Sequence, residues 1–92
     1  MKHTDKIKSL NIENKDLAEE IGDLYYDSLS EFLKELSLKL KMDSKADKGR
    51  GRVKLSKNLE NASELILGAS KEIDLAWDIC KEPVRKFLEE NK

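Results

Sequence analysis

The sequence predicts an all-α protein, built as an antiparallel helical hairpin with a short C-terminal helix. Charged residues make up 40% of the 92 residues and the chain has one proline, a composition typical of long exposed helices. Two long stretches with apolar residues every three or four positions lie on either side of a polar, glycine-containing break. One hairpin leaves much of both apolar stripes uncovered. We therefore expect a single domain, residues 1–92, that forms a homodimeric four-helix bundle.

The N-terminal segment, residues 1–10, is expected to be a loose arm, because it has little to bury beyond Ile7 and Leu10. The first helix is predicted over residues 13–42, and its apolar face repeats closer to every eleven residues than to every seven. Gly22 lies inside this helix and costs about 1 kcal/mol relative to alanine. The residues of the apolar face are Leu17, Ile21, Leu24, Tyr25, Ser28, Leu29, Phe32, Leu33, Leu36 and Leu40.

A basic turn is predicted over residues 43–52, where Gly49 and Gly51 follow small polar residues. The second helix, residues 53–81, carries two heptad rows, one bulky and one made mostly of alanines. Because small side chains let helices approach closely, we expect this ridge to pack against neighbouring helices. The rows are Leu59, Ile66, Ile73 and Cys80, and Leu55, Ala62, Ala69 and Ala76.

Pro83 interrupts the C-terminal stretch, because it has no backbone N–H to donate and disfavours helix at the residue before it. We expect a kink or break there. A short third helix over residues 83–91 then follows, with Val84, Phe87 and Leu88 on one side.

Charge is unevenly distributed, although the formal net charge is only −1. Residues 32–57 contain nine basic and three acidic residues, whereas residues 11–31 contain seven acidic residues and one lysine. The basic tip of the hairpin is the candidate contact surface. Arginines on a loop can reach phosphates, so an alternative function is binding of a polyanion or nucleic acid there. The candidate residues are Lys45, Lys48, Arg50, Arg52 and Lys54.

Four acidic residues follow one another at steps of four, three and four and so lie on one face of the first predicted helix: Asp16, Glu20, Asp23 and Asp27. Residues 17–25 resemble the EExxD helix of the MazG-type all-helical nucleoside triphosphate pyrophosphohydrolases. The resemblance implies that Glu20 and Asp23 hold Mg²⁺ together with an ExxE pair on a preceding helix. This chain has no ExxE upstream, so the Mg²⁺-dependent hydrolase is kept as a second alternative.

No motif supports another chemistry: CxxC, HExxH, the Walker loop and GxSxG are all missing from the sequence. Serines such as Ser30, Ser37 and Ser63 fall within predicted helices without a histidine base, so we assign no catalytic residue and no cofactor. Cys80 is expected to be a small buried hydrophobe, which fits a reducing compartment. No window approaches a membrane span, and a cytoplasmic protein-interaction or adaptor module that is not an enzyme is the expected function.

Overall fold

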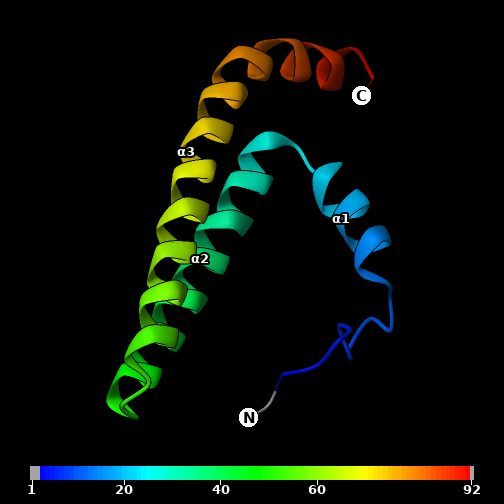
Figure 1. The fold of residues 1–92 in the computed structure, drawn as a ribbon. Helices are drawn as coiled ribbons and strands as arrows, with labels where there is room; N and C mark the ends of the chain where they lie inside the picture. Colours follow the sequence, from blue (N-terminus) through cyan, green and yellow to red (C-terminus); the bar gives the residue numbers. More distant parts are fainter. Residues whose placement is uncertain (1–2, 92) are drawn as a thin grey trace.

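The computed structural model describes residues 3–91 and contains three helices, α1 (Asn14–Gly22), α2 (Tyr26–Gly49) and α3 (Val53–Glu90) (Figure 1). α2 and α3 lie side by side and antiparallel, whereas α1 lies apart from them. The prediction of an all-α helical hairpin is therefore confirmed. The radius of gyration is 16.7 Å, well above the roughly 12 Å of a compact domain of this length. The molecule is a thin rod of 56 × 29 × 17 Å.

The prediction of one continuous helix over residues 13–42 is wrong, because the helix is interrupted at residues 23–25. Asp23 ends α1: its N–H donates to the carbonyl oxygen of Glu19 at 3.0 Å, and the N–H of Leu24 donates to that of Ile21 at 3.1 Å. Tyr25 is extended, with a ψ of 147°. The break follows Gly22, which disfavours helix, and Asp23, whose side chain competes for backbone groups at helix ends. The apolar pattern continues across the break, and for that reason periodicity alone did not reveal it.

The turn at the hairpin tip is shorter than the predicted residues 43–52. α2 continues to Gly49, and residues 50–52 alone connect it to α3. Gly51 has a φ of +80°, a left-handed conformation that glycine adopts without a steric penalty. The backbone N–H of Arg52 donates to the carbonyl oxygen of Asp47 at 2.9 Å and closes the turn.

The separate third helix predicted over residues 83–91 is also wrong, because α3 continues through Pro83 to Glu90. α3 nevertheless bends away from the hairpin axis in its orange segment, near the C-terminus (Figure 1). Proline removes one backbone hydrogen bond and crowds the preceding turn, so it bends a helix without always ending it. The N-terminal arm was predicted over residues 1–10, of which 1 and 2 lie outside the described residues; an isolated bridge pairs Ile7 with Ile12 there.

Serines form the contact line between α2 and α3, which we call the serine seam. They recur every seven residues on each helix, and all six are buried, Ser30 at 1% and Ser70 at 0% exposure. Three cross-helix pairs form along the seam, and each pair's residue numbers sum to the same value, as an antiparallel register requires. The pairs are Ser30 with Ser70, Ser37 with Ser63, and Ser44 with Ser56.

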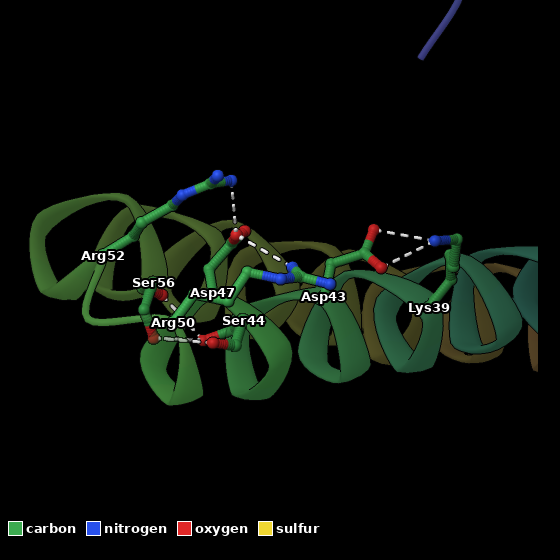
Figure 2. A network of polar contacts seen from close by, with 7 residues as sticks. All are labelled: Lys39, Asp43, Ser44, Asp47, Arg50, Arg52 and Ser56. Carbon is green, nitrogen blue, oxygen red and sulfur yellow. Dashed lines mark hydrogen bonds and ion pairs between the residues drawn. The ribbon is translucent and has the colours of Figure 1, made fainter. Parts of the chain in front are cut away.

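Each α2 serine donates its hydroxyl across the seam to a backbone carbonyl oxygen of α3, at 3.0 Å from Ser30, 2.7 Å from Ser37 and 2.7 Å from Ser44. Ser56 returns a bond to the Ser44 carbonyl oxygen at 2.8 Å (Figure 2). A hydroxyl reaches the facing backbone only when the helix axes are close, near the lower end of the usual 8–10 Å range. The seam therefore combines close approach with satisfied polar groups.

The predicted packing ridge lies beside this contact line and not on it. Ala62 and Ala76 are half-buried, but Ala69 is exposed, and Leu55 is 40% exposed. The prediction counted only apolar residues, and so it passed over the serine row one residue away. Trp77 occupies the next position of the α3 serine row, seven residues after Ser70. Its bulk does not fit a close seam, and α2 begins near that level, where the rings of Tyr25 and Trp77 lie tilted at 39° with centroids 6.4 Å apart.

We expect the size of the side chains in the serine seam to affect the free energy of unfolding more than their hydrogen bonds do. Ser37→Leu should destabilise the protein by about 1–3 kcal/mol, because the larger side chain separates the helices. Ser37→Ala should stay within about 1 kcal/mol of wild type, because the lost hydrogen bond is partly offset by higher helix propensity. The measurement is urea unfolding followed by circular dichroism at one fixed protein concentration. Ser28→Leu, at an exposed α2 position, is the control; equal losses for the two leucine variants would contradict the expectation.

Candidate interaction surface

Apart from apolar residues exposed elsewhere on the helices, such as Phe32, Leu65 and Leu75, the apolar residues that flank the serine seam lie mostly on one side of the hairpin. On α2 and on α3 these residues stand one position before or three positions after a seam serine, as Leu36 and Leu40 do around Ser37. In an antiparallel pair, equal offsets from the contact line place side chains on the same side of both helices. We call this side the apolar face: Leu29, Leu33, Leu36, Leu40, Leu55, Leu59, Ala62, Ile66, Ala69 and Ile73.

The apolar face is only partly covered. Among residues 3–91 no apolar side chain is buried, and the buried residues are the six serines and Asp47. Leu36 and Leu55 keep 36% and 40% of their surface exposed, and Leu33, Leu59 and Ile66 are half-buried. The hairpin thus has a polar contact line and no hydrophobic core of its own.

The opposite side of the seam is polar. Lys34 and Asp74, each four positions after a seam serine, form an ion pair across the helices with Nζ and Oδ2 3.1 Å apart. The Ser30 hydroxyl, and after it the Lys34 ammonium, holds the pKa of the Asp74 carboxyl below its ordinary value. This side is therefore ordered by charge, in contrast to the apolar face.

Two of the predicted basic residues, Arg50 and Arg52, lie at the hairpin tip beside Asp47 (Figure 2). Arg50 and Arg52 each place Nη1 3.3 Å from Oδ1 of Asp47, a carboxylate that is 11% exposed. Lys45, Lys48 and Lys54 are exposed at the same end, with Lys45 and Lys48 on α2 and Lys54 on α3. The arginines are thus fixed to the tip by Asp47 but keep about half of their surface, 61% and 49%. A contact role for this surface stays a prediction.

The acidic row predicted on one helix is divided by the chain break. Asp16 and Glu20 lie on α1, Asp23 ends it, and Asp27 begins a different helix. Glu20 and Asp23 are both exposed. Within residues 3–91, no group of three or more histidine, cysteine, aspartate or glutamate side chains is placed to hold a metal ion. The two carboxylates are therefore not joined by the further ligands that the hydrolase resemblance implies.

A hollow of about 240 Å³ opens at the end of the hairpin remote from the tip, beside the neighbouring rings of Tyr25 and Trp77. Two of its basic residues are already paired: Lys81 with Asp78 at 3.4 Å and Arg85 with Glu82 at 3.2 Å. Its walls combine aromatic, aliphatic and charged groups without a cluster of converging polar atoms. The full lining is Tyr25, Asp27, Trp77, Lys81, Val84, Arg85 and Leu88.

Cys80 is a free thiol, half-buried where complete burial was expected. It lies seven positions after Ile73, near the end of the bulky row and close to the bend of α3. None of the helices in residues 3–91 is long and apolar enough to cross a membrane. Sequence reasoning missed the serine seam, although serines at seven-residue spacing on both predicted helices were a visible signal.

Comparison with known protein families, with curated proteins and with solved structures found no match. The function is therefore argued from the apolar face, the serine seam and the charged tip.

Because Asp74 forms an ion pair with Lys34, we expect the free energy of unfolding to decrease in acid. The folded-state pKa of Asp74 lies below its unfolded value of 3.8, so its contribution is complete above that value and is lost as the pH falls through the folded pKa. Asp74→Asn removes this titration. Melting temperatures of the two proteins should therefore differ at pH 7 and converge between pH 4 and pH 2, and a constant difference over that range would contradict the assignment.

Proposed function

We propose that the protein is a non-enzymatic interaction module whose apolar face binds a second helical hairpin, and that this hairpin is a second copy of the same chain. The product is a homodimeric four-helix bundle. The polar side then remains outside the bundle, where an adaptor would present it to a further partner.

The uncovered apolar face carries this proposal. Burial of apolar surface is the main favourable contribution to folding, at about 25 cal/mol per Å². A hairpin whose buried residues are serines and one aspartate gains little of it. Small chains with so little buried apolar surface usually require a disulfide, a metal or oligomerisation. The single Cys80 provides no intrachain disulfide, and oligomerisation supplies what the hairpin lacks.

The amount of exposed surface fits a partner of the same size. The chain exposes 7577 Å², whereas a folded monomer of 10.6 kDa exposes about 5,500 Å². The excess is about 2,000 Å², and obligate homodimers bury about 1,000–2,500 Å² on each subunit. Part of this excess lies on α1 and the N-terminal arm, which stand apart from the hairpin, and a second hairpin laid on the apolar face would cover part of the remainder.

The two helices of the face also differ in bulk. α2 contributes leucines such as Leu33 and Leu36, and α3 alternates Ile66 and Ile73 with Ala62 and Ala69. Alternation of large and small residues lets facing helices interdigitate without voids. The apolar face therefore alternates large and small side chains, as surfaces that pack against other helices do.

A matched pair of α2 variants tests the proposal. Leu36→Glu places a charge in the apolar face and should weaken dimerisation about a hundredfold or more, because the carboxylate is desolvated in the interface. Leu38→Glu makes the same change two residues away, on the polar side, and should leave the dimer intact. Sedimentation equilibrium and circular dichroism on both variants provide the mass and the helix content.

The wild-type protein should have twice the 10.6 kDa mass of one chain at micromolar concentration. A wild-type monomer that is fully helical, or equal weakening by the two variants, would contradict the proposal.

Polyanion binding is the second candidate, favoured by the exposure of Lys45, Lys48 and Lys54 at the tip. If it holds, the affinity for a DNA duplex should fall linearly with the logarithm of salt concentration. Arg50→Glu/Arg52→Glu should weaken binding and reduce that slope. The control Lys71→Glu/Lys81→Glu makes the same charge change away from the tip. Fluorescence anisotropy gives both affinities, and equal losses for the two double variants would contradict a tip-specific site.

A further inference from the structure

We infer that the two hairpins of the dimer lie antiparallel, with the basic tip of each copy against the acidic open end of the other. The inference rests on the proposed homodimer and adds the alignment of its two copies. It follows from the distribution of charge along the hairpin once the register of the serine seam is known.

The seam register divides the hairpin into two halves at one level. Because paired seam residues sum to a constant, residue 39 of α2 lies opposite residue 61 of α3. The tip half, residues 39–61, has eight basic and three acidic residues, a net charge of +5. The open half, residues 26–38 and 62–78, has two basic and seven acidic residues, a net charge of −5. Each hairpin is thus a strong dipole along its length.

Two alignments bring the apolar faces of two copies together by a two-fold axis. An axis along the hairpin places both tips at the same end. The two tip halves, each with a net charge of +5, then face one another, and so do the two open halves, each with −5. An axis across the hairpin reverses one copy, so that each tip faces the other copy's open end. Like charges placed side by side are unfavourable and opposite charges set the orientation of an interface. Charge therefore selects the antiparallel alignment.

Side-chain size is compatible with this alignment. An axis across the hairpin at its midpoint passes near Ala62, which lies opposite residue 38 in the seam register. Leu55 and Ala69 stand seven residues to either side of Ala62. The axis brings Leu55 of one copy against Ala69 of the other, so a large residue meets a small one. The exposed Ala69 is then covered by the second copy.

The distance between two tips tests the alignment. Val53 is exposed and uncharged, so Val53→Cys in a Cys80→Ser background accepts a spin label near the tip without altering the charge pattern. In the antiparallel dimer the two labels are displaced along the bundle by 18 residues, about 27 Å at 1.5 Å per residue. Double electron–electron resonance should therefore give a clearly longer distance for the Val53 labels than for labels placed at the midpoint of the hairpin. In the parallel dimer the two distances should be similar.

Leu38→Cys in the same background is the matched control, because a label at the midpoint lies at the same level in both alignments. Equal distances for the Val53 labels and the Leu38 labels would overturn the antiparallel alignment and leave the dimer standing. A wild-type monomer by sedimentation would overturn the proposed function together with this inference.

Salt dependence of the unmodified protein provides a second test, whose sign differs between the alignments. Salt screens attraction between opposite charges, so the dissociation constant of the antiparallel dimer should rise about tenfold or more between 50 mM and 500 mM salt. In the tip-to-tip dimer salt screens repulsion, and the dissociation constant should fall. An unchanged or falling dissociation constant would overturn the inference.

Discussion

Close contact between α2 and α3 through the serine seam is the constraint on which the rest of the structure depends. Six small hydroxyl side chains occupy the positions that leucines fill in most helical hairpins. The three serines of α2 and Ser56 donate to the facing backbone, whereas Ser63 and Ser70 donate to carbonyl oxygens of their own helix. The result is a hairpin with satisfied polar groups at its centre and apolar residues displaced to one side. The thin shape, the missing core and the exposed apolar face are all consequences of this one choice of side chain.

The two ends of the hairpin lie where the serine seam ends. At the tip, Gly51 allows a three-residue connection and Asp47 holds Arg50 and Arg52 against it. At the open end, Trp77 takes the place of a serine in the α3 row, and there α2 begins and the chain diverges into α1. Small residues keep the helices together and a large one ends the contact. The length of the hairpin is thus encoded in a single row of α3.

The serine seam leaves the apolar face exposed, and the proposed function rests on that face. A polar contact line holds two helices in register but provides little hydrophobic stabilisation, so the apolar face is available for a second hairpin. The charge dipole adds direction to that surface, because attraction between opposite ends distinguishes two otherwise similar ways of pairing. In the proposed dimer, the apolar face provides both the contact and the hydrophobic stabilisation, and the charge dipole sets the orientation of the two hairpins.

The sequence alone determined the helical class, the position of the tip and the residues of the apolar face, because heptad spacing and glycine placement are local signals. It also predicted a bend at Pro83, since a proline lacks an N–H wherever it stands. Only the tertiary structure decided that α2 and α3 meet through Ser37 and Ser63 and not through the neighbouring Leu59 and Ala62. The physical reason is that a buried serine becomes favourable only when a facing carbonyl oxygen is within reach, and that is a property of two helices and not of one.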